Sequence, residues 1–284
     1  MLLRQWIVNA LCVGLFLLTC RAEFTPHFTK FLESKYGKEI TKNLTRKDLG
    51  VLSMGSFGGT NNGSYKSTNR PVIFVHGVTQ RAVVFTAHRT LFGLADYDEQ
   101  DLYATSWGDG GLTLMYNVKL KCEYAKQIRQ FIIAVNEYTG SKVDVIAYSM
   151  GAAVSRKAIL GGSCVDTNEE LGEAITKRVD TFVSLAGVVH GIEFCPSMFP
   201  GCNLLNGFAC ESEYLKELNS QTERYEGSSS YAVYSKDDRI VGQKCCNHQC
   251  SDLPHANATT PKSGHTHMSM FFATDDMKNG LNHV

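Results

Sequence analysis

The order of apolar runs and helical patterns predicts an α/β protein, with a mostly parallel sheet flanked by helices in a single domain. Short β-rich runs at residues 71–75, 143–147, 180–186 and 231–234 alternate with helical patterns, of which residues 118–138 form the longest. Strand–helix–strand connections of this kind join parallel strands. Ligands bind such sheets beyond the carboxyl ends of the strands, so functional residues are expected in the loops there.

The pentapeptide AYSMG at residues 147–151 follows one of these β-rich runs and precedes a helix-like run. A serine at such a strand-to-helix turn stands clear of the sheet, and the residues two positions on either side must be small, as this alanine and glycine are. Because the turn opens a helix, the backbone N–H of Met150 is free to donate to an oxyanion. The pattern predicts an α/β-hydrolase fold with Ser149 as nucleophile, although the pentapeptide alone also fits a serine that merely begins a helix.

Candidates for the acid and the base follow the serine in the order that this fold requires, acid first and histidine last. Asp237 and Asp238 come just after the run at 231–234, where a carboxylate can orient an imidazole. His265 and His267 lie further on, in a loop of small residues. Each residue alone is equally typical of a turn or a solvated surface. Their order behind the serine favours catalysis.

A second oxyanion donor is expected in the loop after an early strand. His76 and Gly77 end the run at 71–75. Gly77 lets the backbone come close to a substrate, and the N–H of Val78 can then point into the site. Because His76 precedes the serine in the chain, we interpret it as structural, holding this loop.

The first 22 residues have the features of a secretory signal peptide. Arg4 supplies a positive charge, residues 7–19 are largely apolar, and small residues precede a cleavage point after Ala22. Cleavage there would leave residues 23–284 as one extracellular domain. Three acceptor sequons agree with secretion and predict glycosylation at Asn43, Asn62 and Asn257.

Charge and cysteine content narrow the function classes. The chain has 28 basic and 28 acidic residues, a balance that gives no reason to expect nucleic acid as a partner. Beyond the signal peptide no stretch approaches the ~18 apolar residues of a transmembrane segment. Eight cysteines follow the signal peptide, and their even number predicts disulfides of undetermined pairing. Residues 245–250 are rich in cysteine and histidine but lack the paired spacing of a zinc site, so disulfides are favoured and no metal is expected.

The motifs at residues 75–77, 147–151, 237–241 and 264–265 together resemble the class 2 lipase family, small secreted α/β-hydrolases with an Ala-x-Ser-x-Gly turn. The resemblance covers most of residues 71–272. It implies an enzyme without cofactors that cleaves carboxylic esters of acyl lipids, with an acyl lipid or ester as its partner and a transient contact with a lipid interface.

Carried over to this sequence, the resemblance implies a triad and an oxyanion hole. The implied residues are Ser149 as nucleophile, Asp238 as acid, His265 as base, and Val78 and Met150 as oxyanion donors. Asp238 fits the family's Tyr-Ser-x-x-Asp-x-Ile-Val pattern better than its neighbour at 237 does. His265 is preferred over the histidine at 267 because it directly follows a glycine.

Other interpretations remain open at this stage. A catalytically inactive lipid-binding or signalling protein on a hydrolase scaffold would share the fold, and an acyltransferase would share every site residue. The chain also departs from the compact family members at residues 23–70 and 193–210. The second of these segments is apolar and irregular, and either covers the site or packs on the core away from it.

Overall fold

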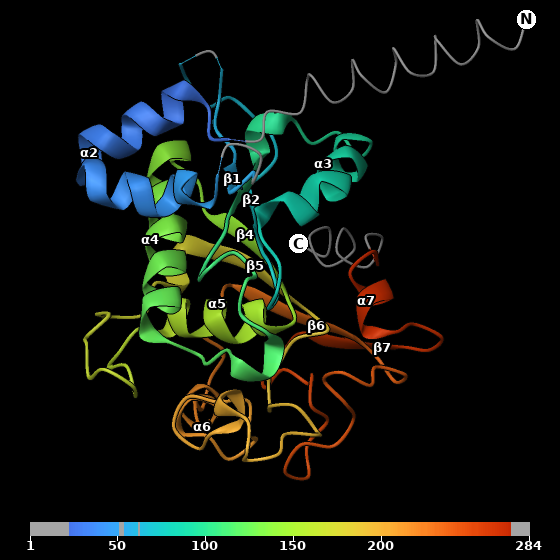
Figure 1. The fold of residues 1–284 in the computed structure, drawn as a ribbon. Coiled ribbons are helices and arrows are strands. Elements are labelled where there is room, and N and C mark those ends of the chain that lie inside the picture. Colours follow the sequence, from blue (N-terminus) through green and yellow to red (C-terminus); the bar gives the residue numbers. More distant parts are fainter. Residues whose placement is uncertain (1–22, 51–53, 62, 274–284) are drawn as a thin grey trace, which may run out of the picture.

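The computed structural model describes residues 23–50, 54–61 and 63–273, which form a seven-stranded sheet with helices on both faces (Figure 1). The strands are β1 (Ser56–Phe57), β2 (Val72–Val75), β3 (Leu102–Thr105), β4 (Val143–Tyr148), β5 (Val179–Leu185), β6 (Ser229–Ser235) and β7 (Ala258–Lys262). The α-helices are α2 (Pro26–Thr45), α3 (Thr86–Gly93), α4 (Cys122–Thr139), α5 (Met150–Leu160), α6 (Glu213–Asn219) and α7 (His267–Met270). The expected signal peptide at residues 1–22 lies outside the described residues.

The strands lie in the order β1-β3-β2-β4-β5-β6-β7. Every neighbouring pair is parallel except β1 and β3. The predicted mostly parallel sheet flanked by helices is therefore confirmed. Since the carboxyl ends of parallel strands meet at one edge, the loops after β2, β4, β6 and β7 gather there.

Side chains of the central strand β4 alternate between two hydrophobic cores. Val143, Val145 and Ala147 belong to the core formed with α2, α4, α5 and α6. Ile146 and Tyr148 belong to the core formed with α3 and α7 on the opposite face (Figure 1). Burial on both faces explains why this run is apolar along most of its length.

Helix α4 supplies the longest buried stripe. Ile128, Phe131, Ile132 and Val135 recur at helical spacing and are all buried. The helix ends at Gly140, whose left-handed backbone (φ 67°) suits a glycine. It begins at Cys122, four residues later than the sequence pattern predicts.

Helix α2 lies outside α4 and is longer than the sequence indicates (Figure 1). Phe28 and Leu32 are buried, while a bend at Gly37 (φ 83°) lets the chain continue to Thr45. Arg46 then ends the helix in a left-handed conformation (φ 54°).

All eight cysteines of the described residues form disulfides, as their even number predicts. The pairs are Cys122–Cys164, Cys195–Cys202, Cys210–Cys246 and Cys245–Cys250. The cysteines of residues 245–250 are therefore bound to sulfur. Among the described residues, no helix combines the length and apolarity needed to cross a membrane.

Candidate active site

Ser149 occupies the sharp turn between β4 and α5. Its backbone is left-handed (φ 56°), a strained conformation for a residue with a side chain, and the side chain is buried. A Cβ atom on Gly151 would lie 2.5 Å from the carbonyl oxygen of His76, so only glycine fits beneath the turn. The carbonyl oxygen of Ser149 accepts the N–H of Val188, which ties the turn to the loop after β5.

The imidazole of His267 joins this serine to a carboxylate. His267 Nε2 lies 3.0 Å from Ser149 Oγ, and His267 Nδ1 lies 2.7 Å from Asp238 Oδ2. An ionised carboxylate only accepts hydrogen bonds, so Nδ1–H donates to Asp238 and Nε2 is left to accept the serine hydroxyl. Asp238 Oδ1 accepts the backbone N–H groups of Ile240 and Val241, at 2.8 and 3.0 Å, which fixes the carboxylate.

His265, the histidine preferred from the sequence, is not in this group. Its carbonyl oxygen accepts Ser235 Oγ–H at 2.6 Å, and this contact anchors the loop. The alternative acid, Asp237, accepts the N–H of Gly264 at 2.6 Å and anchors the same loop. The preference for His265 over His267 is therefore corrected: the glycine shapes the loop, and the chain reaches Ser149 only two residues after His265.

A helix-capping signal separates the two histidines. Thr266 and Ser269 form a capping box, in which each side chain accepts the backbone N–H of the other residue. His267 is consequently the first residue of α7, and its carbonyl oxygen accepts Tyr148 Oη–H at 2.9 Å. In the sequence, Thr266 was the available signal, because threonine is a preferred residue at the N-cap of a helix.

The loop after β2 is held by His76. Trp107 N donates to His76 Nε2 at 3.0 Å, so the imidazole proton is on Nδ1, which donates to Gly77 O at 2.7 Å. Burial lowers the pKa of His76 to about 4, and the ring stays neutral at physiological pH. C=O and N–H point in opposite directions in a trans peptide, so this bond turns the N–H of Val78 away from His76. The sequence-based interpretation of His76 as a residue that holds the loop agrees with these contacts.

Two further contacts shape the candidate oxyanion hole. Gly77 N donates to Gln80 Oε1 at 3.0 Å, and a Cβ on Gly77 would lie 3.0 Å from Ser149 Cβ, so the loop passes very close to the serine. Met150 is the first residue of α5, where backbone N–H groups have no partner within the helix. Val78, Ser149 and Met150 border the same hollow.

An apolar hollow opens beside Ser149. Its lining residues come from the loops after β2, β5 and β6, from the 3₁₀ turn at residues 115–117, from the segment before α6 and from the start of α5. They are Val78, Met115, Ser149, Met150, Val188, Ile192, Phe208, Ile240 and Val241. Segment 193–210, which the compact family members lack, contributes only Phe208 to this lining, while Phe199 stacks on Tyr116 with ring centroids 4.8 Å apart. The Cys210–Cys246 disulfide ties this segment to the loop that carries the acid.

The sequons predicted to carry glycans have different positions. Asn43 is exposed near the end of α2, and Asn257 is exposed just before β7. The side-chain oxygen of Asn257 accepts Ser230 N–H at 2.9 Å and a guanidinium N–H of Arg224 at 2.6 Å. Asn62 lies outside the described residues. Glycosylation remains a prediction.

Comparison with known proteins places this geometry in a family. Residues 69–279 match the family described as Lipase (class 2). Among solved structures, Aspergillus fumigatus lipase B is similar with a TM-score of 0.56 and 16% identity, over 81% of this chain and 57% of that one. Bacillus licheniformis lipase BlEst2 in its mature form is similar with a TM-score of 0.54 and 14% identity, over 80% of this chain and 97% of that one.

These likenesses differ in what they support. The chain spans little more than half of the Aspergillus lipase, and identities this low show a shared α/β-hydrolase fold. A search of curated proteins gave no match. The family match is stronger evidence of function than the structural similarities, because it spans about three quarters of the chain and includes every residue of the site. The chain therefore belongs to the class 2 lipases, and is a carboxylic-ester hydrolase with the α/β-hydrolase fold.

Proposed function

We propose that this protein is a secreted serine hydrolase that cleaves carboxylic esters of acyl lipids through a Ser149–His267–Asp238 triad. The observation that carries the proposal is the imidazole of His267, which lies within hydrogen-bond distance of both the serine hydroxyl and the buried carboxylate. The predicted signal peptide and the four disulfides support an extracellular location.

The geometry supports a two-step reaction. His267 Nε2 takes the proton from Ser149 Oγ as the oxygen attacks the ester carbonyl carbon. The carbonyl oxygen becomes an oxyanion, which the backbone N–H groups of Val78 and Met150 stabilise. Asp238 keeps the imidazole in the required tautomer and stabilises the imidazolium that forms.

The first step ends when the ester C–O bond breaks and leaves an acyl-enzyme, and the second step regenerates the serine. The imidazolium of His267 returns its proton to the departing alkoxide, and an alcohol leaves. Water then attacks the acyl-enzyme with His267 again as base, which releases the carboxylic acid and restores the Ser149 hydroxyl. The apolar hollow beside the serine suits the acyl chain.

The surroundings of the hollow favour a lipid interface as the place of reaction. Leu114, Phe194 and Met268 are each at least 56% exposed, and each lies within two residues of a group that lines the hollow or contacts the serine. Exposed apolar side chains mark contacts with membranes or with other proteins. Because these three lie close in sequence to the site of an acyl-lipid hydrolase, a lipid interface is the contact that we propose. We expect Leu114→Ser with Phe194→Ser to lower activity on an emulsified ester more than on a soluble one. Leu94→Ser, at an equally exposed position beyond α3, is the matched control.

A fluorophosphonate probe tests the proposed nucleophile, because only an activated serine reacts with it. The wild type should be labelled at Ser149, and Ser149→Ala should be neither labelled nor active on a p-nitrophenyl ester. Triad losses cost ~10⁴-fold or more in rate. A Ser149→Ala variant that is within a few-fold of wild type would refute the assignment. Product analysis with added alcohol then separates hydrolysis from acyl transfer.

A further inference from the structure

Arg46 belongs to the N-terminal segment that precedes the family match, yet its side chain reaches toward the active-site loops. The residue ends α2 with a left-handed backbone and a side chain only 9% exposed. Gly55 packs directly on it, since a Cβ at that position would lie 2.7 Å from both the Cβ and the carbonyl oxygen of Arg46. Such a strained residue persists only where the surrounding structure holds it in place.

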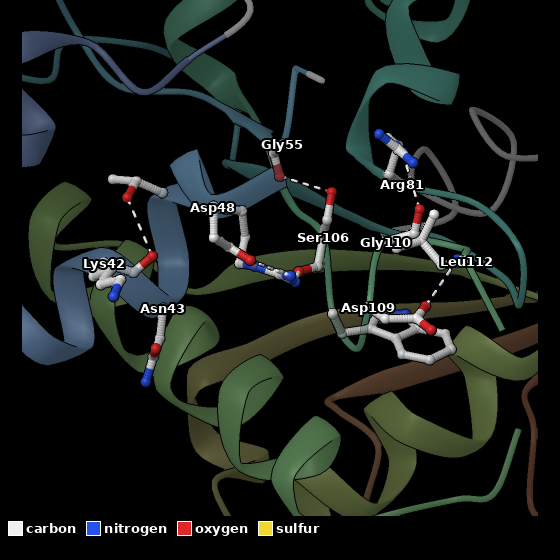
Figure 2. Close-up of polar contacts among 12 residues, drawn as sticks. Lys42, Asn43, Asp48, Gly55, Arg81, Ser106, Asp109, Gly110 and Leu112 are labelled. Atoms are coloured by element: carbon white, nitrogen blue, oxygen red, sulfur yellow. Dashed lines mark hydrogen bonds and ion pairs between the residues drawn. The ribbon is translucent and has the colours of Figure 1, made fainter. Parts of the chain in front are cut away.

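The guanidinium of Arg46 donates to the carbonyl oxygen of Ser106. Its Nε and Nη2 donate to the carboxylate of Asp48, which fixes the plane of the guanidinium. The Ser106 carbonyl also accepts Gln127 Nε2–H at 3.0 Å. Ser106 is itself fixed, because its Oγ–H donates to Gly55 O at 2.8 Å (Figure 2).

The other end of the same peptide group meets His76. Trp107 N–H, which shares a peptide plane with the Ser106 carbonyl, donates to His76 Nε2 at 3.0 Å. The indole also stacks on the imidazole, with centroids 4.8 Å apart and planes 4° from parallel, and its Nε1–H donates to His76 O. A cation on the carbonyl oxygen polarises the peptide and strengthens its N–H as a donor.

We propose that Arg46 is a positioning residue for the oxyanion hole, acting through the Ser106–Trp107 peptide on His76. The strengthened Trp107 N–H keeps His76 Nε2 as an acceptor and leaves the proton on Nδ1. That proton holds Gly77 O and so sets the direction of the Val78 N–H. This inference rests on the proposed hydrolase function, and it gives the N-terminal segment a part in catalysis.

The charges around His76 agree with this arrangement. Burial is the main cause of its lowered pKa, and the positive charges of Arg46 and Arg81 lower it further, against the hydrogen bond to the Gly77 carbonyl. Asp109 and Tyr124 line the same small cavity as His76. Without the charge of Arg46, we expect His76 to protonate at a higher pH, and a protonated ring cannot accept from Trp107.

The test compares Arg46→Met with Thr105→Val. Thr105 Oγ1–H donates to Leu44 O at 2.6 Å, so this control removes a buried hydrogen bond between the same two segments without touching the Ser106–Trp107 peptide. Two quantities are measured on the mature chain of residues 23–284. The first is kcat and KM on a soluble ester, and the second is the pH midpoint of the fluorescence of Trp107, the sole tryptophan of that chain. Because Trp107 stacks on His76, protonation of the imidazole quenches its fluorescence.

Arg46→Met should lower kcat about tenfold with KM within about twofold, less than the 10²–10³-fold loss of an oxyanion donor. The fluorescence midpoint should rise above its wild-type value near 4, because the charge of Arg46 lowers the pKa of His76. Arg46→Lys, which keeps the charge, should restore the midpoint and part of kcat. Thr105→Val should lower the unfolding temperature while leaving kcat and the midpoint unchanged.

The inference is overturned if Arg46→Met only loses stability, with kcat and midpoint equal to those of Thr105→Val. Should Arg46→Met fail to fold, Gln127→Met removes the second donor to the same carbonyl at a partly exposed position. It should lower kcat about two- to threefold, and a wild-type kcat would count against the proposal. The fluorescence midpoint does not depend on ester hydrolysis. If the fluorophosphonate fails to label the wild type, the hydrolase function is refuted. The fluorescence midpoints of wild type and Arg46→Met then still test the link between Arg46 and His76.

Discussion

Replacing His267 and His265 separately by alanine distinguishes the two histidines most sharply. His267→Ala removes both the acceptor for Ser149 Oγ–H and the donor to Asp238. Losing a triad histidine costs about 10⁴–10⁶-fold in kcat, or about 5–8 kcal/mol of transition-state stabilisation. His265 makes its anchoring contact through the backbone carbonyl, which alanine retains. His265→Ala should therefore keep kcat within about threefold of wild type.

The assay is single-turnover hydrolysis of p-nitrophenyl butyrate, together with the rate of fluorophosphonate labelling. Both variants keep Ser149, so a slow labelling rate in His267→Ala reports the loss of serine activation and not the loss of the nucleophile. Unfolding temperatures measured in parallel show that each variant is folded. A dead His265→Ala beside an active His267→Ala would mean that the contacts at Ser149 are not those of the working enzyme.

Three further expectations follow from neighbouring contacts. Asp238→Asn should lose about 10⁴-fold in kcat/KM. Asp237→Asn changes only the bond to the Gly264 N–H and should keep at least about a tenth of wild-type kcat/KM. Comparable losses in both variants would contradict this assignment. Replacing Cys210 and Cys246 by serine opens a 36-residue loop and should lower the free energy of unfolding in urea by about 3–4 kcal/mol, and an unchanged value would show that the disulfide adds nothing. The pKa of His76 is about 4 in the folded chain against 6.5 unfolded, so the unfolded chain binds the extra proton between these values. This group's contribution of about 3 kcal/mol is present above pH 6.5 and is lost as the pH falls to 4. The free energy of unfolding should accordingly drop less between pH 7 and pH 4.5 in His76→Asn than in wild type, and an equal drop would argue against a buried neutral ring.

The sequence pattern was sufficient to predict the strands whose burial determines which residues they contain. The run at 143–147 is apolar because both faces of β4 are buried, and its strand assignment is confirmed. Strand β7 was missed because residues 258–262 include a proline and remain largely exposed at the edge of the sheet. Such a strand is stabilised by its backbone hydrogen bonds to β6, and its sequence lacks the hydrophobic alternation that predicts a strand.

The histidine was misplaced for a similar reason. Chain order behind the serine narrows the candidates for the base to the histidines of the loop after β7. The choice between His265 and His267 then depends on which imidazole faces Ser149 at the end of β4, three strands away in the sheet. That direction is set by bonds to Ser235 and Tyr148, each distant in sequence from the loop. A preference based on the adjacent Gly264 used only the nearest neighbour. Thr266, a preferred N-cap residue, was a better local guide, because it makes His267 the first residue of α7, where the side-chain direction is defined.

The acyl-binding side and the oxyanion side of the site are held in place by different kinds of bond. The acid loop and segment 193–210 are joined covalently through Cys210 and Cys246, so the hollow side of the site depends on an oxidised bond. The oxyanion side depends on hydrogen bonds that start at Arg46 and pass through a single peptide group to His76. A reductant should therefore disturb the acyl-binding side first, and acid should disturb the oxyanion side first. The wild type treated with dithiothreitol should change its preference among acyl chain lengths while kcat on a short ester persists. Acid near pH 4, where His76 takes up its proton, should lower kcat for short and long esters alike without changing that preference. An identical response to both treatments would contradict this division.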